Sequence, residues 1–189
     1  MSTVIASVDR RSPAQLAGIK PGEQLLTING HEIIDVLDYR FYGYDADSHL
    51  TLREPDGAQR AVHIRKQEGQ DLGLNFDTYL MDEMRSCANH CIFCFVDQMP
   101  PGMRQTLYFK DDDARLSFLL GNYITLTNLT EREAQRIIDL HICPINVSVH
   151  TTDPQLHCTM LGNKNAGRSL EYIRAFCKAG IVMNGQIVI

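Results

Sequence analysis

Residues 87–94 read Cys-Ala-Asn-His-Cys-Ile-Phe-Cys, and no other stretch of the 189-residue chain is as distinctive. It places three thiols, those of Cys87, Cys91 and Cys94, within one short loop. A loop of this kind can hold three corners of a cubane 4Fe-4S cluster, which leaves one iron without a protein ligand. The stretch therefore predicts an iron-sulfur site.

The open iron has a chemical use. S-adenosylmethionine can chelate it through its amino and carboxylate groups while the reduced cluster passes an electron to the sulfonium. The bond to the adenosyl carbon then breaks, and the primary radical that forms can abstract hydrogen from an unactivated position.

Other interpretations of the cysteines remain open. A structural zinc site normally shows two cysteine or histidine pairs, and no second pair stands at suitable spacing, although Cys143 or His90 could complete a fourfold shell. The cysteines could also be structural and unliganded. The chain has 6 cysteines, but half of them crowd into residues 87–94, closer than a disulfide framework usually sets them. A reducing compartment with a metal site fits better.

Composition describes a folded globular protein, with 44% hydrophobic and 22% charged residues. The length allows a small domain followed by part of a larger one. A net charge of -5 without clustered Lys and Arg argues against a general nucleic-acid binder. The start lacks the pattern of a signal peptide and no apolar run reaches membrane-spanning length, so a cytoplasmic protein without nucleic-acid or membrane partners is expected.

The first third of the chain predicts a compact β-rich module. Ser12 is placed to cap a short helix that Gly18 ends, and Asn29-Gly30 is typical of a tight hairpin turn. Strands are expected at residues 4–8, 25–28, 50–53 and 61–64. The polar stretch of residues 66–71 predicts the boundary to the next module.

After this boundary the expected strands and helices alternate, which favours a parallel sheet covered by helices. Strands are predicted at residues 72–80, 119–126, 145–150 and 186–189. Helices are predicted after the capping box of residues 130–133 and over residues 169–179, with Gly180 as terminator. Because the chain stops inside its last expected strand, we expect it to be truncated.

Several polar residues are assigned no function. Residues 111–113, three consecutive aspartates, are expected to form a solvated turn. Cys177 lies on the apolar stripe of its helix, where a free cysteine behaves as a small hydrophobe. His141 and His157 lack a partner at metal-ligand spacing and are expected to be structural or exposed.

Residues 1–66 resemble the PDZ domains of bacterial type. The resemblance rests on Ser-Pro-Ala at residues 12–14, Ala-Gly-Ile-Lys-Pro-Gly-Glu at 17–23 and Leu-Leu-Thr-Ile-Asn-Gly-His-Glu-Ile at 25–33. It implies a sheet edge that could accept a peptide or protein partner by strand addition.

Residues 67–189 resemble the radical S-adenosylmethionine superfamily. The spacing Cys-x3-Cys-x2-Cys with Phe93 before the last cysteine carries this resemblance, together with Phe-Val-Asp-Gln-Met-Pro at residues 95–100, Leu-Tyr-Phe-Lys-Asp-Asp-Asp at 107–113 and Gly-Asn-Tyr-Ile-Thr-Leu-Thr-Asn at 121–128. Within the superfamily, the pattern resembles a bacterial branch with an amino-terminal PDZ-like domain and a carboxy-terminal domain of unknown function 512. The fold implied is α/β, a PDZ-like domain followed by an incomplete radical SAM βα barrel.

The resemblance also implies roles for individual residues. Cys87, Cys91 and Cys94 would be the ligands of a 4Fe-4S cluster that cleaves S-adenosylmethionine into a 5'-deoxyadenosyl radical. The other residues carried over are Phe93 against the adenine, and Gly121 and Asn122 at the place of the superfamily's Gly-Gly-Glu segment. Ser148 and His150 lie at the active-site end of a strand, where either could contact cofactor or substrate or simply be a polar residue satisfied at a strand end. A reductant such as ferredoxin or flavodoxin is implied, and no substrate or catalytic residue is.

Two further function classes compete with the enzyme. An interaction module would bind a peptide at the PDZ-like sheet edge and use the cysteines for a structural zinc. An electron carrier would cycle the cluster without cleaving anything, but a simple carrier normally supplies four cysteines.

Overall fold

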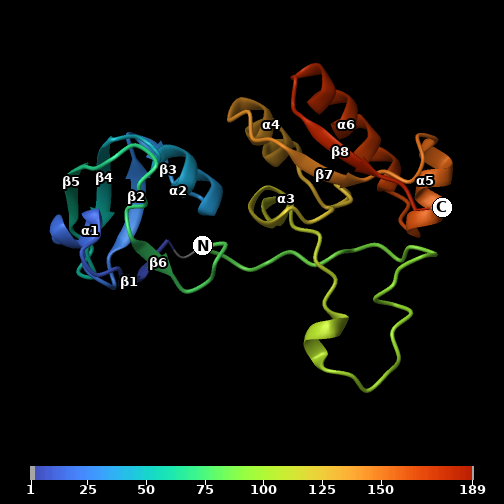
Figure 1. The fold of residues 1–189 in the computed structure, drawn as a ribbon, viewed down its shortest axis with the longest axis horizontal. Coiled ribbons are helices and arrows are strands. Elements are labelled where there is room, and N and C mark those ends of the chain that lie inside the picture. Colours follow the sequence, from blue (N-terminus) through green and yellow to red (C-terminus); the bar gives the residue numbers. More distant parts are fainter. Residues whose placement is uncertain (1–2, 189) are drawn as a thin grey trace. The chain divides into compact units, whose positions relative to one another are not determined.

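The computed structural model describes residues 3–188 and divides the chain into two compact units, Met1–Glu83 and Met84–Ile189 (Figure 1). We refer to them as the first and the second unit. Both combine strands with helices, and the first is the richer in strands.

A four-stranded antiparallel sheet forms the centre of the first unit, with the order β3-β2-β4-β5. Its strands are β2 (Gln24–Ile28), β3 (His31–Glu32), β4 (Asp47–Arg53) and β5 (Gln59–Arg65). Buried and exposed residues alternate along β4 and β5, because successive side chains point to opposite faces of a sheet. The inner face carries the core of this unit, which includes Leu25, Ile28, Leu50, Leu52 and Ile64.

Local signals in the sequence predicted the turns of this unit correctly. The Ser12 side chain accepts a hydrogen bond of 3.1 Å from the Gln15 amide and so caps α1 (Pro13–Leu16). Gly18 follows α1 with a φ of +75°, and Asn29 and Gly30 turn the chain between β2 and β3 with φ values of +51° and +82°. All three residues therefore adopt a positive φ, which glycine takes without steric cost and asparagine tolerates better than most residues.

The first unit extends beyond residue 66, where the polar stretch predicts its end. The expected strand over residues 72–80 is only β6 (Leu74–Phe76), and it pairs antiparallel with β1 (Ile5–Val8) instead of leading into the second module. Gly73 allows this return, since its φ is +83° and a Cβ there would lie 2.2 Å from the Ser12 Cβ. Sequence analysis also missed α2 (Val36–Tyr42), which Asp35 caps.

The second unit contains a parallel strand pair, β7 (Ile145–Ser148) and β8 (Met183–Gln186), and Ile124 forms a parallel bridge to Val147. Two helices pack on these strands, α4 (Glu131–Asp139) and α6 (Ser169–Lys178) (Figure 1). The remaining elements are α3 (Ala114–Leu120), α5 (Pro154–Leu161) and the 3-10 turns η1 (Gln105–Tyr108) and η2 (Ala166–Arg168). The core joins Ile124, Ile137, Ile145, Val147, Phe176 and Ile181.

Two predicted strands of this unit differ from the structure. Leu119 and Leu120 lie in α3 and not in a strand, because Asp113 caps the start of that helix and Gly121 ends it with a φ of +78°. Only Ile124 of the expected strand over residues 119–126 bridges to β7. The strand predicted at residues 186–189 lies earlier, at β8, and Ile189 is outside the described residues.

The predicted helices of this unit are present. Thr130 and Glu133 form the expected capping box at the start of α4. The helix predicted over residues 169–179 is α6, but Cys177 is exposed, so the prediction of core packing for that thiol is wrong. Tyr172 and Phe176 of the same helix are buried in the core instead, because burying their larger apolar side chains is more favourable than burying a thiol. Among the described residues, no helix combines the length and apolar composition needed to cross a bilayer.

Candidate functional site

The three cysteines of residues 87–94 lie on an irregular segment that backbone hydrogen bonds fix on two sides. The Cys87 amide donates to the Lys110 carbonyl at 2.7 Å. The amides of His90 and Ile92 donate to the carbonyls of Leu161 and Met160, at 2.9 and 3.0 Å. The loop is therefore held against the end of α5 although it contains no helix or strand of its own.

All three thiols are free and partly buried, and they influence one another. Burial, followed by the neighbouring thiols of Cys87 and Cys94, raises the pKa of Cys91 to about 11. Burial also raises the pKa of Cys87. Three grouped thiolates in a half-buried loop would repel one another, and bound iron would offset that repulsion because it is cationic. This donor set could hold an iron-sulfur cluster through three corners.

Lys110 supplies a positive charge beside the loop. Its Nζ donates to the Asn89 carbonyl at 3.0 Å and to both Asp97 carboxylate oxygens at 2.9 and 2.8 Å. Burial lowers the pKa of Lys110, but the hydrogen bond to Asp97 and the nearby thiols outweigh it, so the pKa is raised. The ammonium therefore stays charged, and it partly opposes the effect of burial on the pKa of Cys87 and Cys91 without outweighing it.

Asn89, between the first two cysteines, anchors the loop through its side chain and is only 1% exposed. Its Nδ2 donates to Thr125 Oγ1 at 2.9 Å. Its Oδ1 accepts from Thr127 Oγ1 at 3.0 Å and from Asn163 Nδ2 at 2.7 Å. One amide thus ties the loop to two other segments, a role that sequence analysis missed because its partners are far away in the chain.

The prediction that residues 111–113 form a solvated turn is wrong. Asp112 and Asp113 are each 1% exposed. Asp112 accepts from the Thr125 amide and hydroxyl at 2.6 and 2.5 Å, and burial raises its pKa. Burial would also raise the pKa of Asp113, but its bonds to Arg115 outweigh this and lower it. Asp112 thus connects the segment before α3 with Thr125, which in turn accepts a hydrogen bond from Asn89.

The residues carried over by resemblance fall into two groups. Phe93 and His150 come together, with ring centroids 4.4 Å apart, and His150 has a φ of +57° just beyond the end of β7, where Ser148 lies. Gly121 and Asn122 belong to the turn after α3, and Asn122 Nδ2 donates to Asp111 Oδ2 at 2.7 Å. Asp111 bridges to Ser86, next to the first cysteine.

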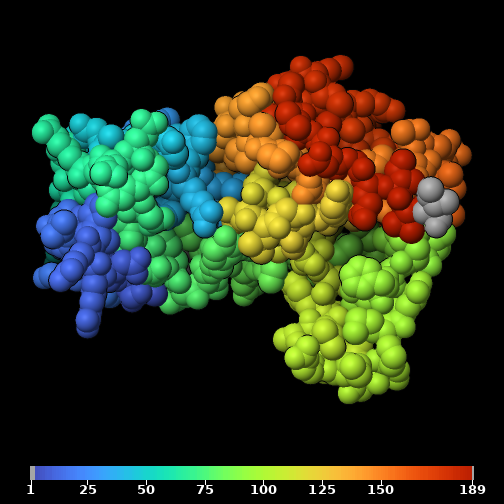
Figure 2. Space-filling view, in the orientation of Figure 1, coloured from blue at the N-terminus to red at the C-terminus, as the bar shows by residue number. Residues whose placement is uncertain are grey.

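The segment between the cysteines and Lys110 projects from the rest of the second unit (Figure 2). It carries exposed apolar side chains, with Phe95 78% and Met103 51% exposed. His157, which was expected to be structural or exposed, is structural. It is fully buried, and its Nε2 lies 3.0 Å from the Ser169 hydroxyl oxygen.

Comparison with known proteins gives two matches. Residues 66–189, more than half of the chain, match the family model of a radical SAM-like domain. Residues 4–53 match that of a PDZ domain. This order agrees with the arrangement that the sequence predicts. A search of the curated proteins finds no match.

Proposed function

The chain belongs to the radical SAM-like family, and on this premise we propose that its second unit binds a 4Fe-4S cluster and S-adenosylmethionine to generate a 5'-deoxyadenosyl radical. The observation that carries the proposal is the loop of Cys87, Cys91 and Cys94, three free thiols pinned by backbone bonds on two sides. Three ligands suit a cluster with one open iron.

When bound, such a cluster supplies one electron to the sulfonium of S-adenosylmethionine, and the sulfur to adenosyl-carbon bond breaks into methionine and the adenosyl radical. A one-electron donor such as ferredoxin or flavodoxin would have to restore that electron.

The chain's own residues would position these groups. Asn89 would anchor the cysteine loop through its side-chain amide. Lys110 bonds to the same loop and would place a positive charge beside the thiolates. The Phe93 ring offers an aromatic face for the adenine, with His150 as its neighbour. Gly121 and Asn122 would approach the methionyl group through their backbone, since the Asn122 amide group already donates to Asp111. Ser148 would face the cofactor from the end of β7.

Two further parts of the proposal concern the architecture and the first unit. The parallel pairing of β7 with β8 and the bridge from Ile124 suit neighbouring strands of a βα barrel. The PDZ-like first unit would bind a peptide or protein partner in the cytoplasm by strand addition at a sheet edge. The alternative of an interaction module with structural zinc is less well supported, because neither Cys143 nor His90 forms a second ligand pair with another residue in sequence.

Anaerobic reconstitution with iron and sulfide tests the proposal. The reduced protein should give a 4Fe-4S electron paramagnetic resonance signal that shifts when S-adenosylmethionine is added. Cys91→Ala should lose the cluster, whereas Cys177→Ala, which removes an exposed and isolated thiol, should keep it. Absence of iron uptake, or a signal indifferent to S-adenosylmethionine, would overturn the proposal.

A further inference from the structure

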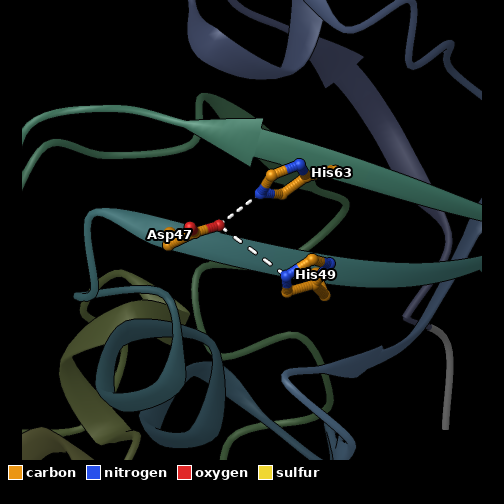
Figure 3. A group of neighbouring side chains, drawn as sticks. All are labelled: Asp47, His49 and His63. Atoms are coloured by element: carbon orange, nitrogen blue, oxygen red, sulfur yellow. Dashed lines mark hydrogen bonds and ion pairs between the residues drawn. The ribbon is translucent and has the colours of Figure 1, made fainter.

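Three potential metal ligands meet on the exposed face of the sheet in the first unit (Figure 3). Asp47 and His49 are two residues apart on β4 and therefore point to the same face. His63 on β5 is the direct cross-strand partner of His49. The antiparallel register thus brings together side chains that are far apart in the sequence.

The ligand atoms of these residues converge. His63 Nε2 donates to Asp47 Oδ1, and His49 Nε2 lies 3.7 Å from the same oxygen. The two imidazole rings are stacked, with centroids 4.3 Å apart and an interplanar angle of 3°. One donor atom from each of the three residues lies within 4.8 Å of the others, so small side-chain rotations would bring them to the separation of about 3.4 Å between ligands in a tetrahedral zinc shell.

A metal ion would use all three side chains at once. It would replace the proton between His63 and Asp47 and accept a lone pair from each of the two rings. The side chains are exposed, at 58% for Asp47, 68% for His49 and 41% for His63, which leaves room for water at the remaining coordination positions.

We propose that Asp47, His49 and His63 form a binding site for a divalent transition-metal ion of the zinc type. Two imidazoles and one carboxylate suit Zn²⁺, Co²⁺, Ni²⁺ or Cu²⁺, whereas Mg²⁺ and Ca²⁺ prefer shells made of oxygen. With three protein ligands the site is open, as in zinc sites that keep an exchangeable water. It uses residues of the first unit alone and does not depend on the cysteines of the second.

Titration of the full chain with Co²⁺ under anaerobic reducing conditions tests this site, because the visible spectrum of Co²⁺ reports its ligands. Binding by imidazole and carboxylate gives weak visible bands without the intense thiolate charge-transfer absorption that the cysteines would produce. We expect such bands to appear and Zn²⁺ to abolish them. His49→Ala and His63→Ala should each weaken Co²⁺ binding about tenfold or more. His31→Ala, which removes another exposed histidine of the same sheet, should leave it unchanged.

Two results would overturn the proposal. One is Co²⁺ binding through thiolates alone, and the other is nitrogen and oxygen ligation that persists unchanged in both histidine variants. Circular dichroism checks that the variants fold. If they do not, the wild-type chain decides, since Zn²⁺ should shift the ring proton resonances of His49 and His63 and not those of His31. Unshifted resonances would count against the site.

Discussion

Gly162 passes so close to His90 that a Cβ on the glycine would lie 2.4 Å from the His90 carbonyl oxygen. Gly162 also ends α5 in the left-handed region, with a φ of +58°. The end of this helix therefore supports the loop that carries Cys87 and Cys91, and no side chain fits between them.

Gly162→Ala should destabilise the second unit by about 2 kcal/mol or more, because the backbone of the cysteine loop would have to move. Denaturant unfolding and iron content after reconstitution measure the effect. Gly102→Ala is the matched control, since Gly102 also has a positive φ, +86°, but a Cβ there would meet nothing within 4 Å. Equal losses in the two variants would mean that strain in the glycine backbone, and not contact with His90, is responsible.

Asn89→Ala should destabilise the second unit by about 1–3 kcal/mol, because it leaves Asn163, Thr125 and Thr127 without their shared amide. We expect faster amide hydrogen exchange at His90 and Ile92 as well, since the loop loses its side-chain anchor. Asn128→Ala provides the control, as its amide makes one long bond of 3.4 Å to the Ser86 carbonyl. Unchanged exchange in Asn89→Ala would show that backbone bonds alone hold the loop.

The contrast between capping signals and buried charges explains what the sequence could predict. Ser12, Asn29 and Thr130 act on residues within a few positions, so their roles follow from local pattern. The burial of Asp112 depends on Thr125, which only the folded chain brings close. In the same way, the cysteine spacing predicted a cluster site, but the anchors of the loop at Asn163 and Gly162 are far away in sequence.

Asp113→Asn should destabilise the protein by about 3–5 kcal/mol at neutral pH, because Arg115 would remain buried beside a neutral amide. Arg115 lowers the pKa of Asp113 against the opposing effect of burial, so the folded state holds this carboxylate ionised. Its stabilisation is complete above the unfolded pKa of about 3.9 and is lost as pH falls through the lowered folded value. Stability measured against pH should therefore converge for wild type and variant in acid.

The exposed Asp139 is the control for that measurement, since its carboxylate accepts a hydrogen bond of 2.8 Å from Gln135 at the surface. Asp139→Asn should change stability by less than about 0.5 kcal/mol at any pH. If Asp113→Asn behaves like Asp139→Asn, the buried pair contributes no net stability.

A fragment of residues 1–83 should unfold cooperatively, whereas a fragment of residues 1–66 should be largely unfolded. The shorter fragment lacks β6, the cross-strand partner of β1, and the buried side chains of Leu72 and Leu74, which are 1% and 4% exposed. It also loses Asp71, which accepts a hydrogen bond of 3.0 Å from the Tyr39 hydroxyl. Each buried leucine contributes about 1.5–3 kcal/mol, so their loss removes much of the roughly 5–15 kcal/mol that is typical of a small domain. Thermal unfolding followed by circular dichroism distinguishes the two. Equal midpoints would place the boundary at the polar stretch after residue 66, and a cooperative transition confined to the longer fragment would place it after β6.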